Sequence, residues 1–150
     1  MMNKKGYKEY TGICVVTGQN GSGKTKALFE LLEKYPKAKI FDEPEQALDP
    51  NNAIALAEKL LKGYKENKQH LIISTKSMLF LRAIECYSDY FGVMRDLNVY
   101  DMDSAAEKGN IDTAPNVMYS EYGISEIYDK YNSAFKFLDN LVDQIKRDAE

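Results

Sequence analysis

The segment from Gly18 to Thr25 has the residue types and spacing to bind phosphate. It reads Gly-Gln-Asn-Gly-Ser-Gly-Lys-Thr and fits the pattern G-x-x-x-x-G-K-[ST]. Glycines let backbone N–H groups converge on a phosphate, the lysine reaches the terminal phosphates, and the threonine hydroxyl suits Mg²⁺. We therefore expect a nucleoside triphosphate site, with these phosphate ligands: Gly18, Asn20, Gly21, Ser22, Gly23, Lys24 and Thr25.

The flanking segments have the patterns that would hold such a loop. Residues 13–17 are a short apolar run rich in β-branched residues, which predicts a buried strand. After the loop, apolar residues recur at helical spacing until Pro36. Strand, glycine loop and helix is the order that a phosphate-binding loop needs, because the amino end of the helix attracts anions.

Two carboxylates stand at the end of a second predicted strand, residues 38–42, and just beyond it. In a nucleoside triphosphatase an Asp at this place serves Mg²⁺, and a Glu directly after it orients or deprotonates the attacking water. We assign Asp42, together with Thr25, to Mg²⁺, and Glu43 to the water. A solvated turn with ordinary surface acids is the alternative interpretation.

Strands and helices alternate along the rest of the chain, which indicates an α/β domain of three layers with a mainly parallel sheet. Asp49 and Pro50 predict the start of a helix, residues 71–75 a third strand and residues 77–87 another helix. Further strands are expected at 91–95, 99–102 and 117–119, and a long helix at 125–147. We expect one domain, divided into an arm (1–9), a nucleotide-binding core (10–102), a loop (103–116) and a carboxyl-terminal strand and helix (117–150).

The last predicted helix carries an apolar stripe from Ile124 to Ile145 in steps of four and three. Such spacing fits a helix pair. A stripe of this width more often packs on the domain's own sheet, and that is our main expectation. A homodimer or a partner protein covering the helix is the alternative.

Composition excludes several classes of function. The formal net charge is −3, so the chain has no evident surface for nucleic acid. No apolar stretch is long enough to span a membrane, and the start lacks the apolar core of a signal peptide. Two cysteines form no metal or disulfide framework, and Cys14 is expected to be buried. We expect a cytoplasmic protein.

Three segments together resemble motifs of ABC-type ATPases, particularly the RecF/SMC/OLD-like branch. Residues 18–25 are similar to the Walker A motif, Asp-Glu-Pro-Glu-Gln-Ala-Leu-Asp-Pro at 42–50 to Walker B and the D-loop, and Leu-Ile-Ile-Ser-Thr-Lys-Ser at 71–77 to the switch region. The resemblance implies a reduced P-loop NTPase core that binds ATP with Mg²⁺. It also implies contact with a second subunit at the nucleotide face.

The chain departs from that family in two places. Only 17 residues lie between Lys24 and Asp42, so there is no room for the lobe with the Q-loop and the Leu-Ser-Gly-Gly signature. Hydrolysis by the chain alone should therefore be slow. Lys76 stands where the family has a switch histidine, and it is either a cationic γ-phosphate contact or a surface lysine. Tyr7 and Tyr10 are candidates for stacking on adenine.

Three functions remain open on the sequence. The first is a minimal ATPase that uses MgATP hydrolysis as a conformational switch, for which Glu43 is the main support. The second is a nucleotide-responsive module without turnover, favoured by the missing signature and by Lys76. The third is a small P-loop kinase, which the few scattered arginines disfavour.

Overall fold

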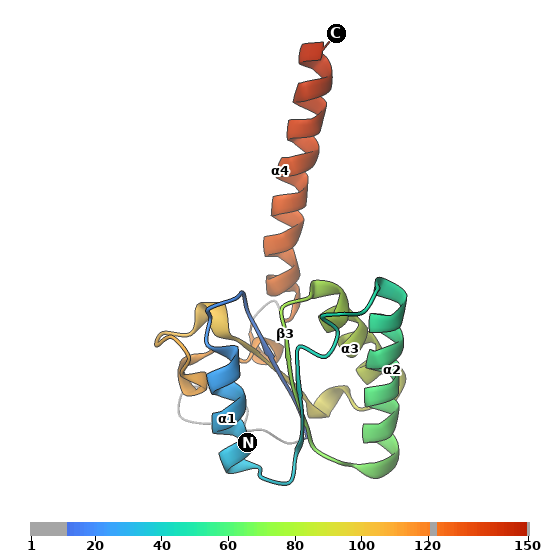
Figure 1. The fold of residues 1–150 in the computed structure, drawn as a ribbon, viewed down its shortest axis with the longest axis vertical. Helices are drawn as coiled ribbons and strands as arrows, with labels where there is room; N and C mark the ends of the chain where they lie inside the picture. Colours follow the sequence, from blue (N-terminus) through green and yellow to red (C-terminus); the bar gives the residue numbers. More distant parts are fainter. Residues whose placement is uncertain (1–11, 121–122, 150) are drawn as a thin grey trace.

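The computed structural model describes residues 12–120 and 123–149, which form a parallel α/β domain and a long helix that leaves it (Figure 1). The strands are β1 (Ile13–Thr17), β2 (Lys39–Asp42), β3 (Leu71–Thr75) and β4 (Leu97–Asp101). The helices are α1 (Lys24–Lys34), α2 (Pro50–Asn67), α3 (Met78–Tyr90) and α4 (Ser125–Ala149). Short 3₁₀ turns occupy Met94–Asp96, Met102–Ser104, Ile111–Thr113 and Val117–Tyr119.

All four described strands are parallel, in the order β2-β3-β1-β4. Their carboxyl ends therefore meet at one edge of the sheet. Strand β3 lies between β1 and β2, with Thr75 beside Thr17 on one side and Ser74 beside Asp42 on the other. The end of β3 thus separates the glycine loop from the two carboxylates.

Alternating residues of the strands enter two cores, one on each face of the sheet. Ile13, Val15 and Ile73 face the core that α2 and α3 cover. Cys14 and Val16 face the other, which α1 and the segment 102–114 cover. These layers confirm the predicted α/β architecture, and Cys14 is fully buried as expected.

Side-chain caps fix the starts of two helices, and the Asp49 cap is predicted from the sequence. The Asp49 side chain accepts a hydrogen bond of 2.8 Å from the Asn52 N–H, and Pro50 is the first residue of α2. Ser77 accepts from the Phe80 N–H at the start of α3. Helix α3 therefore begins shortly after the end of β3, and α2 begins after the turn 43–49 that follows β2.

The fourth strand lies at 97–101, so the prediction of a strand at 91–95 is wrong. Gly92, just after the end of α3, has a φ of 71°. This left-handed backbone differs from the extended backbone of a strand. The Val93 N–H donates to Ser88 O, and the Val93 side chain is buried in the α2–α3 core. Its apolar character therefore serves helix packing. The strand expected at 99–102 overlaps β4 at residues 99–101, and Met102 begins a 3₁₀ turn.

The expected short strand at 117–119 is a 3₁₀ turn. Asn116 takes the place that a neighbouring strand would fill, because its Oδ1 accepts from the Val99 N–H of β4. Its amide group donates to Asn98 Oδ1 at 3.0 Å. Together with the isolated antiparallel bridge between Tyr100 and Asn116 and the Asp101 N–H bond to Pro115 O, this side chain covers the outer edge of β4 without a fifth strand.

Helix α4 matches its predicted length, but the expectation that its stripe packs on the sheet is wrong beyond the first turns. Ile124 and Ile127 are buried in the domain core. From residue 132 onward the described helix is exposed, and Figure 1 shows it extending away from the domain. No helix among the described residues has the length and apolar character needed to cross a membrane.

Candidate functional site

The glycine loop joins β1 to α1 at the carboxyl edge of the sheet. Gly23, the residue before α1, has a φ of 92°. A Cβ at this position would lie 2.3 Å from Gly109 Cα, so the loop packs backbone to backbone against the segment after β4. This close approach requires glycine at residue 23 for space as well as for conformation.

Lys24 turns its ammonium group back beneath the loop. Its Nζ donates to Gly18 O at 2.7 Å and to Gln19 O at 3.1 Å. The same atom lies 3.7 Å from Glu43 Oε1, and only 7% of the Lys24 side chain is exposed. The cation is therefore held between the glycine loop and the predicted catalytic carboxylate.

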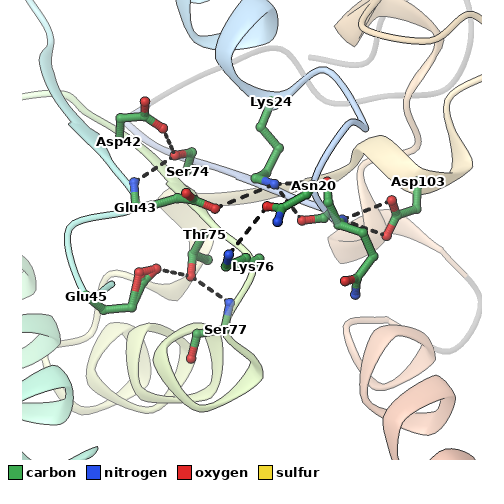
Figure 2. Close-up of polar contacts among 12 residues, drawn as sticks. Asn20, Lys24, Asp42, Glu43, Glu45, Ser74, Thr75, Lys76, Ser77 and Asp103 are labelled. Atoms are coloured by element: carbon green, nitrogen blue, oxygen red, sulfur yellow. Dashed lines mark hydrogen bonds and ion pairs between the residues drawn. The ribbon is translucent and has the colours of Figure 1, made fainter. Parts of the chain in front are cut away.

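Ser74, at the end of β3, organises the two carboxylates that follow β2 (Figure 2). Its hydroxyl donates to Asp42 Oδ1 at 2.5 Å and accepts from the Glu43 N–H at 2.9 Å. The Glu43 N–H also reaches Ser74 O at 3.0 Å. These bonds hold Asp42 and Glu43 at the edge of the sheet, where the sequence placed them.

Glu43 has a left-handed backbone, with a φ of 46°. For a residue with a Cβ this conformation costs about 1 kcal/mol or more, and such strain gathers at functional sites. The turn brings the Glu43 carboxylate toward Lys24 while Asp42 continues the strand. The backbone thus points two successive carboxylates in different directions (Figure 2).

A third carboxylate, Glu45, is buried beside the site. Thr75 Oγ1 donates to Glu45 Oε1 at 2.5 Å and accepts from the Ser77 N–H. Burial raises the pKa of Glu45, the Thr75 hydrogen bond opposes the rise, and the nearby charge of Glu43 adds to it. Glu45 therefore joins the turn after β2 to the start of α3, a role that the sequence did not indicate.

The remaining predicted residues surround this centre. Lys76 Nζ lies 3.4 Å from Asn20 Oδ1, so this lysine does reach the glycine loop. Thr25 is exposed on the first turn of α1, and Asp42 is exposed at the end of β2. No group of three carboxylate, imidazole or thiol side chains that could hold a metal occurs among the described residues.

The segment after β4 contributes residues that sequence reasoning missed. The Asp103 carboxylate accepts from the Gln19 N–H at 3.0 and 3.2 Å, which clamps the loop from outside (Figure 2). The Gln19 side chain donates to the Tyr131 hydroxyl of α4. Lys130, also of α4, pairs with Asp101 at 3.2 Å. The long helix is therefore anchored directly beside the glycine loop.

A cavity of about 280 Å³ lies next to Glu43 and Glu45. Lys76 and Ser77 line it on the polar side, and Leu48 and Leu79 on the apolar side. The site thus continues from the loop, past Glu43, into a recess bounded by the starts of α2 and α3.

Other sequence candidates are away from the site or undescribed. His70 precedes β3 and packs edge-on against Tyr35, whose ring centre is 6.3 Å away. It therefore lies at the opposite edge of the sheet. Tyr7 and Tyr10, the candidates for adenine stacking, fall outside the described residues.

Comparison with known proteins assigns the chain to no family. No protein-family model and no curated protein matches the chain. A solved structure, "Crystal structure of APE1195", is similar with a TM-score of 0.41 and 14% sequence identity. The match covers 69% of this chain and 66% of that one, so the chain spans slightly less than two thirds of that protein's length. The structure establishes a parallel α/β domain, and the comparisons assign no family.

Proposed function

We propose that the chain is a minimal ATPase, related to the ABC-type and RecF-like enzymes, that binds MgATP on the loop 18–25. The observation that carries the proposal is the position of Lys24 Nζ, which lies under the loop and 3.7 Å from Glu43 Oε1. A cation there can exchange its contacts with the Gly18 and Gln19 carbonyls for the terminal phosphates. A carboxylate beside those phosphates can act on a water molecule.

Unsatisfied polar atoms support a ligand at this place. Ser22 Oγ and Glu43 Oε1 are buried and have no hydrogen-bond partner among the described residues. Buried polar atoms are normally satisfied, and a phosphate oxygen accepting from the Ser22 hydroxyl and a water molecule donating to Glu43 Oε1 would meet that need. The strained φ of Glu43 is a further sign of a functional position.

Mg²⁺ fits the donors that are present. Asp42 and Thr25 offer a carboxylate and a hydroxyl, and Mg²⁺ typically takes one or two carboxylates, several waters and the substrate phosphates. The ion would neutralise charge on the phosphates when bound.

In the proposed reaction the water oxygen attacks the γ-phosphorus and Glu43 accepts a water proton. The bond from the γ-phosphorus to the bridging oxygen breaks, and ADP and inorganic phosphate are released. Lys24 stabilises the charge on the phosphates, and Lys76 approaches from the Asn20 side of the loop. No signature segment closes over the γ-phosphate, so turnover by the chain alone is slow and a partner is expected to accelerate it.

Phosphate release by the full chain with MgATP tests the proposal, with Glu43→Gln compared with Glu33→Gln, an exposed control on α1. Loss of the general base should lower turnover by about 100-fold or more and leave ATP binding intact, while the control behaves like the parent. A parent that binds ATP without turnover would instead support the nucleotide-responsive module. Substrate-stimulated ADP release would support the kinase.

A further inference from the structure

The exposed part of α4 carries a continuous apolar stripe, formed by Phe135, Leu138, Leu141, Val142 and Ile145. Phe135 is 64% exposed, Leu138 is 51% exposed, and the other three expose between 45% and 59%. Phe137 is also exposed on α4 but lies outside the stripe. The remaining large exposed hydrophobic residues among those described stand apart on other elements: Phe29, Leu48, Leu79, Tyr90 and Tyr119. The stripe is therefore the one extended apolar surface of the described chain.

The spacing of the stripe is that of a helix pair. Phe135 and Val142 stand seven residues apart, and Leu138 and Ile145 follow each of them by three. These are the a and d positions of a heptad, and Leu141 flanks them at a g position. Tyr128 and Tyr131 continue these a and d positions toward the domain, and Tyr131 contacts the glycine loop there. We call this line of a and d residues the seam.

The exposed segment of α4 would be only marginally stable as an isolated helix. Residues 132–149 extend about 27 Å beyond the domain, and isolated helices of 12–15 residues are barely stable in water. The segment also contains Asn132, Ser133 and Asn140, which are weak helix formers. Its helical form therefore calls for packing along the stripe.

The charges favour a protein partner over a membrane. Lys136, Lys146 and Arg147 are balanced within this segment by three aspartates, at positions 139, 143 and 148. Helices that lie on anionic membranes are instead rich in basic residues on the polar face. A covering surface must be apolar, elongated and about as long as the stripe, and α4 of a second copy has these properties.

We propose that α4 pairs in parallel and in register with α4 of a second copy, as a short two-stranded coiled coil. In this orientation e positions face g positions, so Asp139 lies opposite Ala134 and Lys146 opposite Leu141. Like charges do not meet, and the Lys146 stem covers Leu141. Pairing buries on the order of 1,000 Å² in total, the lower end for a specific interface, and places the two nucleotide faces on the same side.

Sedimentation velocity of the full chain from about 1 to about 100 µM tests this pairing, which should have a dissociation constant on the order of 10 µM. Leu138→Lys places a charge in the seam and should give a monomer at every concentration. Phe137→Lys changes a neighbouring aromatic residue that is 67% exposed but lies outside the seam, and it should still form dimers. At a concentration well below the dissociation constant, where both variants are monomeric, thermal unfolding should be the same for the two, since neither side chain enters the core.

Cysteine cross-linking tests whether the two α4 helices lie parallel. In a Cys86→Ser background, which removes the exposed native thiol, Ile145→Cys should cross-link two copies on mild oxidation, and Gln144→Cys should not. A parent that stays monomeric throughout the range, or a Phe137→Lys variant that dissociates as Leu138→Lys does, would overturn the pairing. Dimers whose Ile145→Cys copies fail to cross-link would overturn the parallel arrangement, and binding of a monomeric chain to anionic vesicles would assign the stripe to lipid.

Discussion

Lys24 Nζ lies 3.7 Å from Glu43 Oε1, although the two residues follow strands that are not neighbours. Strand β3 separates β1 from β2, and the gap is closed by the left-handed turn at Glu43 and by the inward turn of Lys24. The predicted phosphate-binding cation and the predicted catalytic carboxylate therefore share one microenvironment. A substitution of either changes the charge that the other experiences.

Replacing Glu43 by glycine and by alanine separates backbone strain from side-chain chemistry. Both variants lose the carboxylate, but only alanine retains a Cβ at a φ of 46°. Glu43→Gly should therefore unfold with a free energy about 1 kcal/mol higher than that of Glu43→Ala. Urea unfolding measures the difference, and two variants of equal stability would show that this backbone conformation carries no strain.

Two glycines of the loop should respond very differently to alanine. Gly21 and Gly23 both have positive φ, at 82° and 92°, but a Cβ at Gly21 meets nothing within 4 Å, whereas one at Gly23 meets Gly109 Cα at 2.3 Å. Gly21→Ala should cost about 1–2 kcal/mol of unfolding free energy. Gly23→Ala should cost about 3 kcal/mol or more, because the backbone itself must move. Equal losses in thermal or urea unfolding would contradict the close packing of the loop on the segment after β4.

Glu45 should make the stability of the domain depend on pH. Its folded pKa is raised above the ordinary value of 4.5, mainly by burial, so the folded chain holds the proton more tightly than the unfolded chain. The free energy of unfolding therefore falls as pH rises from the unfolded pKa through the folded pKa, and stays lower above it.

Glu45→Gln keeps an acceptor for the Thr75 hydroxyl and removes this titration. Relative to the parent, the variant should be more stable at roughly pH 7 than at roughly pH 4, as measured by urea unfolding at both. A stability difference that does not change between the two pH values would show that Glu45 is not held in this way.

Local patterns were sufficient to predict the centre of the site. The run before Gly18, the helix ending before Pro36 and the cap at Asp49 all depend on residues close in sequence, and the structure has each of them. Placing Asp42 and Glu43 required only that parallel strands end at the same edge.

The contributions from the last third of the chain depend on tertiary packing. The apolar residues around Val93 pack in the same core as α3. Because their pattern looks like that of a strand, the fourth strand is predicted at 91–95 and not at Leu97–Asp101. With that strand placed correctly, Asp101 and Asp103 would have stood out as acids at the carboxyl edge. The exposure of α4 could not be predicted, because a stripe of this width has the same pattern whether it faces a sheet or a second helix.

Equilibrium binding of MgATP to the full chain tests the central claim most directly, before any turnover is considered. The parent should bind, and Lys24→Ala should lose binding by about 100-fold or more, because the removed cation lies beneath the loop. Lys26→Ala, which changes an exposed lysine of the same helix, should bind like the parent. A parent that binds no nucleoside triphosphate, or a Lys24→Ala variant that binds as well as the parent, would contradict the assignment of residues 18–25 as a nucleotide site.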